Sequence, residues 1–173
     1  MKNLIFINGV MGGGKTTTCK MLLELLPKAV FLDGDWCWYA NPWQVTKETE
    51  MMAMTNMSYL LNSYLDCSVY ENVIFGWVLH REGMTENVLS MLKNTQYNLH
   101  KFTLICSEST LISRLQKDID SGVRKNVSWE HALQTRPNFE NMDKSGYKKI
   151  ITDDVTQEQV VDTIYNIIYS PRL

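Results

Sequence analysis

The sequence lacks the features that direct a chain into a membrane or an oxidising compartment. No apolar run is long enough to span a bilayer. The short apolar stretch after Met1 is followed by glycines rather than by a signal-peptide core and cleavage site. The cysteines form no Cys-x-x-Cys pair and are too widely spaced for a zinc site or a dense disulfide framework; they are Cys19, Cys37, Cys67 and Cys106. We therefore expect reduced thiols and a cytoplasmic protein.

An excess of charge of either sign is also missing. Seventeen Lys and Arg side chains stand against nineteen Asp and Glu, which leaves a net charge of −2. This balance gives no electrostatic reason to expect a nucleic acid or a membrane surface as a partner. The chain contains no repeat, low-complexity tract or flexible linker, and 173 residues suffice for one well-packed core. We expect residues 1–173 to form a single domain, monomeric or homodimeric, that binds small molecules.

Short apolar runs alternate with longer amphipathic ones along the chain. The first kind predicts strands buried on both faces, at 4–8, 29–33, 73–78, 102–106 and 149–152. The second kind predicts helices from the glycine-rich loop to 26, then at 47–65, 85–94, 109–120, 128–142 and 157–169. Candidate helix caps are Thr46, Thr85, Ser107 or Ser109, Ser128 and Thr156. This alternation predicts a three-layer α/β/α sandwich with a parallel sheet, in which ligands bind beyond the carboxyl ends of the strands.

The most specific pattern is the segment GVMGGGKT at residues 9–16, which fits the phosphate-binding motif G-x-x-x-x-G-K-[ST]. It directly follows a predicted strand and opens a predicted helix, as the motif requires. Its glycines allow the backbone N–H groups to wrap around a phosphate chain, and the helix adds its positive N-terminal end. Lys15 should reach the β- and γ-phosphates of ATP, and the Thr16 hydroxyl should bind Mg²⁺. The predicted nucleotide-binding residues here are Gly9, Met11, Gly12, Gly13, Gly14, Lys15, Thr16 and Thr17.

Two carboxylates follow the second predicted strand, in Asp33-Gly34-Asp35. Phosphoryl transfer to a hydroxyl needs a group that orients the acceptor and takes its proton, together with ligands for the metal. Asp35 suits the first role, which makes it both catalytic and acceptor-binding, and Asp33 suits the metal through water. The alternative is a solvated turn, for which Asp-Gly-Asp is a common composition.

These motifs carry a resemblance to a known group. The N-terminal phosphate-binding loop with Phe31-x-Asp33-x-Asp35 resembles the shikimate-kinase and gluconate-kinase group of nucleotide-kinase-like P-loop proteins. Segments 100–107 and 111–115 are similar to those of tunicamycin-resistance and chloramphenicol-phosphotransferase proteins. The resemblance implies five parallel strands in the order 2-3-1-4-5, a substrate-binding insert at about 36–65 and a lid at about 116–128.

The sequence departs from this group at the third predicted strand. No acid ends that strand, so the standard second metal-side aspartate is missing, and the resemblance assigns its role to Asp33. His80-Arg81-Glu82-Gly83 stands where shikimate kinases carry three glycines, which argues against shikimate as the substrate.

Arginines complete the predicted site, because guanidinium groups stabilise the charge of the transferring phosphoryl group. Arg124 lies in the predicted lid and is the catalytic candidate. Arg114 should meet the nucleotide base or phosphates, and Asp153, after the fifth strand, should approach the adenine or else cap the last helix. Arg81 and Arg136 are candidates for binding the acceptor. The alternative for each arginine is an ordinary surface position.

Four aromatic residues follow Asp35 closely: Trp36, Trp38, Tyr39 and Trp43. They form either a wall for a ring-bearing acceptor, with Trp36 as the predicted contact, or a small satellite core. The nearby methionines at 51, 52, 54 and 57 are interpreted as core residues.

The sequence thus predicts a kinase that uses ATP and Mg²⁺ to phosphorylate a hydroxyl or phosphate of a small molecule. The missing acid after the third strand motivates an alternative, a nucleotide-dependent ligand-binding or resistance protein with little phosphotransfer. A polynucleotide end kinase is a third class, which the near-neutral charge disfavours.

Overall fold

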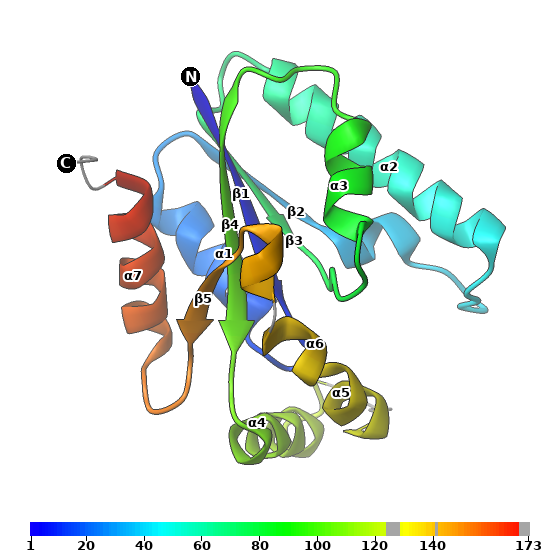
Figure 1. Cartoon of the computed structure of the whole chain (residues 1–173), viewed down its shortest axis with the longest axis vertical. Helices are drawn as coiled ribbons and strands as arrows, with labels where there is room; N and C mark the ends of the chain where they lie inside the picture. The colour runs from blue at the N-terminus through cyan, green and yellow to red at the C-terminus, as the bar shows by residue number, and fades with distance from the viewer. Residues whose placement is uncertain (124–128, 141, 170–173) are drawn as a thin grey trace.

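A five-stranded parallel sheet in the order β2-β3-β1-β4-β5 lies at the centre of the protein. The structure, a computed structural model, describes residues 1–123, 129–140 and 142–169. The strands are β1 (Lys2–Gly9), β2 (Ala29–Asp33), β3 (Asn72–Gly76), β4 (Tyr97–Ile105) and β5 (Lys148–Ile151). Their order and direction confirm the predicted fold (Figure 1).

Helices cover both faces of the sheet (Figure 1). One layer contains α1 (Lys15–Leu25) and α7 (Gln157–Tyr169), and the other contains α2 (Lys47–Asp66) and α3 (Met84–Ser90). Side chains of β1 alternate between them, because Ile5 and Ile7 pack toward α1 whereas Leu4 and Phe6 pack toward α2. Burial on both faces explains why this strand is apolar along its length rather than at every second position.

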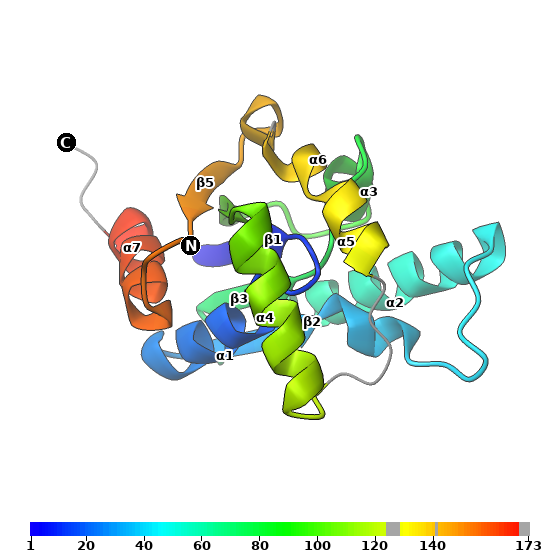
Figure 2. The same cartoon turned by 90° about the horizontal axis from the view of Figure 1, so that it is seen from below.

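A third group of helices lies beyond the carboxyl ends of the strands (Figure 2). It comprises α4 (Glu108–Asp120), α5 (Trp129–Thr135) and α6 (Pro137–Glu140). Leu111, Leu115 and Ala132 of these helices form a separate cluster with Val10 of the phosphate-binding loop. Two 3₁₀ helices, η1 (Gly34–Trp38) and η2 (Met142–Ser145), complete the described elements.

The predicted helix at 128–142 is wrong in its continuity. The chain instead forms α5 and α6 with a break at Arg136–Pro137, because a proline has no N–H and disfavours a helical conformation in the residue before it. Pro137 opens α6, the helical position that proline tolerates best. The proposed cap Ser128 lies outside the described residues.

The other proposed caps give mixed results. Thr46 forms a reciprocal capping box with Thr49, and the Ser107 side chain accepts a hydrogen bond from the Thr110 N–H. Thr156 accepts a hydrogen bond from the Gln159 N–H at 3.3 Å. Thr85 is not a cap: α3 begins after Gly83, and the buried Thr85 hydroxyl instead pairs with the Tyr147 hydroxyl at 2.8 Å.

Within the described residues, no helix combines the length and apolarity needed to cross a membrane. The four cysteines are free thiols, as predicted.

The junction between β2 and η1 depends on a glycine. A Cβ at Gly34 would lie only 2.4 Å from Cγ of Trp77, the residue that follows β3. The Trp77 side chain therefore packs directly on the Gly34 backbone, in space that any Cβ at position 34 would need. The contact places Asp33 and Asp35 directly beside the segment that follows β3.

We expect Gly34→Ala to lower the free energy of unfolding by about 1–3 kcal/mol, the usual cost of overpacking a filled site. Urea denaturation measures this change. Trp77→Ala removes Cγ and Cδ1, the two nearest atoms. In this background the methyl group added by Gly34→Ala should destabilise the protein less than it does in the wild type. An alanine at 34 that left the unfolding midpoint unchanged would show that the Trp77 ring moves aside without cost.

Candidate functional site

The phosphate-binding loop connects β1 to α1 and has the conformation that its glycines permit. Gly12 and Gly14 have positive φ angles of 80° and 94°, which side-chain-bearing residues rarely adopt. A Cβ at Gly12 would lie 2.6 Å from Cδ2 of Leu115, so α4 packs directly against the loop. The Lys15 ammonium donates a hydrogen bond to the Val10 carbonyl at 3.0 Å, which holds the lysine over the loop.

The two residues predicted to bind a metal are in contact. The Thr16 hydroxyl donates to Oδ2 of Asp33 at 3.0 Å, although one residue begins a helix and the other ends a strand. The second oxygen of Asp33 accepts the Asp35 backbone N–H at 3.1 Å. Asp33 is 8% exposed, whereas Asp35 lies at the surface in the first turn of η1. The buried carboxylate therefore restrains the backbone at Asp35.

An interaction that the sequence did not reveal joins β1 to the segment after β3. The side chain of Asn8 is fully buried and makes two hydrogen bonds with the Leu79 backbone. Its amide donates to the Leu79 carbonyl at 3.0 Å, and its oxygen accepts the Leu79 N–H at 2.8 Å. A polar residue at the end of a buried strand was the available signal, since such a residue requires a partner. This contact holds residues 77–80 beside the phosphate-binding loop.

Cys19 lies under the loop and has no exposed surface. Burial raises the pKa of its thiol, as does the nearby Asp33 carboxylate, while Lys15 acts in the opposite direction. The side chain is therefore a protonated packing group rather than a nucleophile.

Arg114 and Asp153 link α4 to the loop after β5. The Arg114 guanidinium donates to the Thr152 hydroxyl at 3.0 Å and to the Thr152 carbonyl at 2.7 Å. The Asp153 carboxylate accepts hydrogen bonds from the Thr110 hydroxyl and from the N–H and hydroxyl of Ser107, which lower its pKa. Asp153 therefore binds the start of α4 and not the start of the last helix.

The two predicted acceptor-binding arginines are paired with carboxylates. Arg81 contacts Glu50 in the first turn of α2 at 2.8 Å. Arg136 contacts Glu140 at 2.7 Å and also donates to the Cys106 carbonyl at 3.3 Å. Arg124, the catalytic candidate of the lid, lies outside the described residues.

The aromatic residues after Asp35 divide between core and surface. Trp38 is half-buried against the α2 core, and its ring lies 5.6 Å from that of Trp43. Trp36 is 59% exposed, and its ring lies 5.3 Å from that of Phe31. Trp38 therefore belongs to the core, while a wall for the acceptor at Trp36 stays a prediction. The methionines also divide: Met57 is core, as predicted, but the same prediction is wrong for Met51 and Met52, which are exposed.

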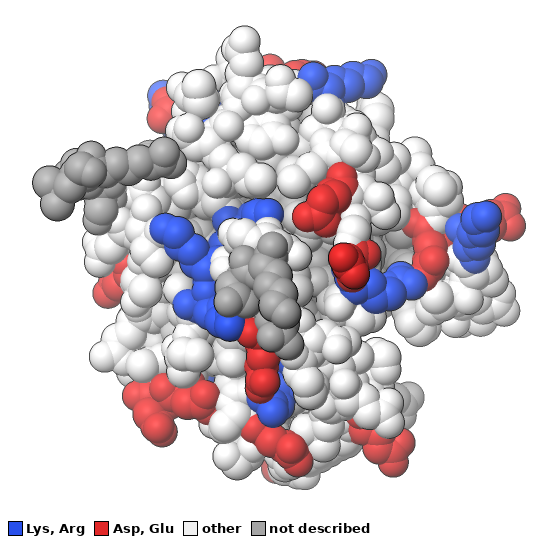
Figure 3. Space-filling model, viewed as in Figure 1, with Lys and Arg blue, Asp and Glu red and all other residues white. Residues whose placement is uncertain are grey.

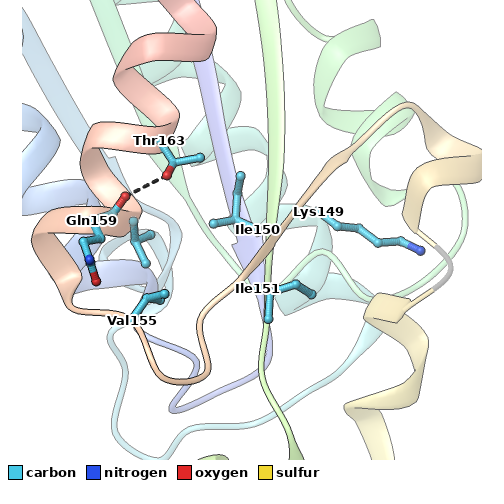
Figure 4. A pocket seen from close by; sticks show the side chains of 7 residues that line it. Lys149, Ile150, Ile151, Val155, Gln159 and Thr163 are labelled. Carbon is cyan, nitrogen blue, oxygen red and sulfur yellow. Dashed lines mark hydrogen bonds between the residues drawn. The ribbon is translucent and has the colours of Figure 1, made fainter.

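A hollow lies away from this site, between the edge strand β5 and α7 (Figure 4). Ile151, Val155 and Gln159 line it, and the Thr163 hydroxyl donates to the Gln159 carbonyl at 2.8 Å. None of the predicted site residues lines it. On the face in Figure 3, several Lys and Arg side chains gather near the centre, and acidic side chains lie around them.

The fold and the site together define a P-loop protein of the nucleotide-kinase type. A family model described as an AAA domain matches residues 5–144, and the chain belongs to this family. A search among curated proteins gives no match.

Solved structures similar to this chain show the same fold. The tunicamycin resistance protein of Deinococcus radiodurans is 20% identical with a TM-score of 0.72, and the alignment covers 98% of this chain and 96% of that one. A gluconokinase from Sinorhizobium meliloti is 14% identical with a TM-score of 0.67, covering 98% of both chains. The shikimate kinase of Acinetobacter baumannii, solved with shikimate, is 22% identical with a TM-score of 0.64, covering 100% and 96%.

Proposed function

We propose that this protein is a cytoplasmic, ATP-dependent phosphotransferase that moves the γ-phosphoryl group of ATP to a hydroxyl or phosphate of a small molecule. The observation that carries the proposal is the 3.0 Å contact between Thr16 and Asp33. It brings the phosphate-binding loop and the carboxylates after β2 into one site.

The residues present suit ATP and Mg²⁺. Lys15 and the N–H groups of the glycine loop would hold the phosphates, with the lysine exchanging the Val10 carbonyl for phosphate oxygens. Thr16 and Asp33 supply the hard oxygen ligands that Mg²⁺ prefers. Two protein ligands are enough, because Mg²⁺ keeps several waters and binds substrate phosphates. The bound metal would neutralise charge on the transferring phosphoryl group.

We assign Asp35 to the acceptor. Its backbone N–H is bound by Asp33, next to the phosphate-binding loop, and its carboxylate is exposed and so accessible to an incoming hydroxyl. The carboxylate would accept the hydroxyl proton as the acceptor oxygen bonds to the γ-phosphorus. The bond from that phosphorus to the bridging oxygen breaks, and ADP leaves with the electron pair.

The arginines and aromatic residues are assigned supporting roles. Arg114, with Asp153, would contact the base or the phosphates after leaving Thr152. Arg136 would turn from Glu140 toward the phosphates or the acceptor, and Arg124 of the lid would stabilise the transition state. Trp36 and Arg81 would contact the acceptor.

The experiment that tests the proposal measures ADP release over a panel of hydroxyl compounds and nucleotides, with product formation followed by mass spectrometry. Calorimetric titration with ADP and ATP, with and without Mg²⁺, tests the nucleotide site separately. Phosphorylation of at least one acceptor is expected. Absence of nucleotide binding would overturn the proposal at its foundation.

A second candidate function is nucleotide-dependent ligand binding with little phosphotransfer. It is favoured by the segment after β3, where Trp77 follows Gly76 and no acid ends the strand. Binding of a ligand in the presence of nucleotide, without ligand-dependent ADP release, would support this candidate over the kinase.

We expect Asp33→Asn to raise the Mg²⁺ concentration needed for half-maximal transfer by about ten-fold, the loss typical of a perturbed metal site. The reason is that the amide keeps an oxygen near Thr16 but removes the negative charge. A titration of activity with Mg²⁺ measures the change. ADP binding without metal serves as the control and should remain at the wild-type value. An unchanged Mg²⁺ requirement would remove Asp33 from the metal site.

A further inference from the structure

Two segments meet where the acceptor is expected to bind. The first is residues 33–52, from the last residue of β2, and the second is residues 77–86, after β3. The two segments together are here called the acceptor end. Gly34 packs against Trp77, and Arg81 contacts Glu50, so the segments touch at two points. In Figure 1 the start of α2 projects to the side of the sheet next to these strand ends.

The acceptor end is acidic, although the protein as a whole is nearly neutral. Residues 33–52 contain four acids and one lysine, and residues 77–86 contain two acids and one arginine. The whole chain has a net charge of only −2. Like charges repel, so this end disfavours a carboxylate or phosphate on the acceptor.

The arginines that would offset this charge are already committed. Arg81 is bound by Glu50 and Arg136 by Glu140, and the only other arginine in the described part of the chain, Arg114, is bound by Thr152. Burial lowers the pKa of His80, and Arg81 and His131 lower it further, so the imidazole adds no charge at neutral pH. A paired Arg81 still has N–H groups that can donate to an uncharged oxygen.

Large apolar side chains are exposed at the same end. Trp36 is 59% exposed, Tyr39 98%, Trp43 63% and Met51 58%. Trp36 packs on Phe31 on the α1 side of β2, whereas Trp43 packs on Trp38 on the α2 side, so Trp43 and Met51 are the exposed apolar side chains on the same side as Glu50. They suit the body of a ring- or chain-bearing molecule.

We propose that the phosphoryl acceptor is an uncharged hydroxyl compound with an apolar ring or chain, bound at the acceptor end between Asp35 and these exposed side chains. The inference rests on the proposed function, whose substrate class it specifies. It assigns Glu50 a positioning role, because this carboxylate neutralises Arg81 and thereby selects against anionic acceptors.

The test compares matched pairs that differ in one charge: methyl shikimate with shikimate, methyl hydroxymethylbenzoate with hydroxymethylbenzoate, and thymidine with its monophosphate. Affinity is measured calorimetrically in the presence of Mg²⁺ and ADP, so that the result does not depend on turnover. We expect the uncharged member to bind about ten-fold more tightly or better in each pair that binds. Equal or tighter binding of the charged members, or no binding by any uncharged member, would overturn the inference.

Two variants separate the effect of the Arg81–Glu50 pair from the effect of the overall negative charge of the acceptor end. Glu50→Gln frees Arg81 and should reduce the preference for uncharged compounds several-fold. Glu48→Gln removes the same charge from the same turn but leaves the Arg81–Glu50 pair, and should change the preference less. Equal effects of the two variants would contradict the role of the pair. Absence of ADP release with every compound would count against the proposed function, while the binding preference would still decide the inference.

Discussion

Lys15→Ala is expected to lower kcat/KM by about 10²–10³-fold, the loss typical of removing one donor to developing charge. Lys15 begins α1 and is held over the phosphate-binding loop by the Val10 carbonyl. A nucleotide would replace this carbonyl as its partner, so the variant loses binding energy to the β- and γ-phosphates as well as transition-state stabilisation. Calorimetry with Mg²⁺ and ATP, together with ADP release, measures both losses.

The matched control for this prediction is Lys20→Ala. Lys20 is an exposed lysine on the same helix, five residues further along the chain. The Lys20→Ala variant should bind nucleotide and release ADP like the wild type. Both variants should keep the wild-type thermal unfolding midpoint. Retention of tight nucleotide binding by Lys15→Ala would contradict the assignment of residues 9–16 as the phosphate site.

Asp35→Asn is expected to lower kcat by about 10²–10⁴-fold, the usual contribution of general acid–base catalysis. The substitution keeps the size of the side chain and the backbone hydrogen bond to Asp33, but the amide cannot accept the acceptor proton. Affinity for Mg²⁺ and ADP should stay within about two-fold, because Asp35 is not assigned to the nucleotide. Steady-state kinetics with the best acceptor, and calorimetry with nucleotide, separate the two effects.

Glu82→Gln provides the comparison for Asp35→Asn. Glu82 is exposed and lies in the acceptor end, so its loss changes the local charge by the same amount without removing the proposed base. It should leave kcat within about two-fold of the wild type. Equal losses in the two variants would mean that local charge, rather than a proton acceptor at position 35, controls the rate.

The sequence predicted the phosphate-binding loop and most helix and strand positions, because these depend on local patterns. Residues 9–16 specify a backbone conformation through their own glycines, and β1 is marked by its continuous apolar run. The strand order came from the resemblance to a known group, since no local pattern states which strands are neighbours.

The parts that the sequence did not predict depend on contacts between distant residues. Asn8 and Leu79 are 71 residues apart, and Arg81 and Glu50 are 31 apart. Hydrophobicity predicted burial for Met51 and Met52, but the helix turns them to the surface while Met57 faces the core. The assigned roles of Asp35, Trp36, Arg81 and Arg136 remain predictions until the variants are measured.

The Asn8–Leu79 contact also affects the chemical stability of the protein, through deamidation of Asn8. Asn8 is followed by Gly9, and an asparagine before glycine readily deamidates, because no side chain hinders attack of the next backbone nitrogen on the carboxamide. In the folded protein the carboxamide is buried and held by two hydrogen bonds, which oppose this attack. A chain that unfolds loses the protection, and the carboxylate formed cannot donate to the Leu79 carbonyl. Deamidation at this position would therefore leave refolded molecules with a repulsive contact directly beside the phosphate-binding loop.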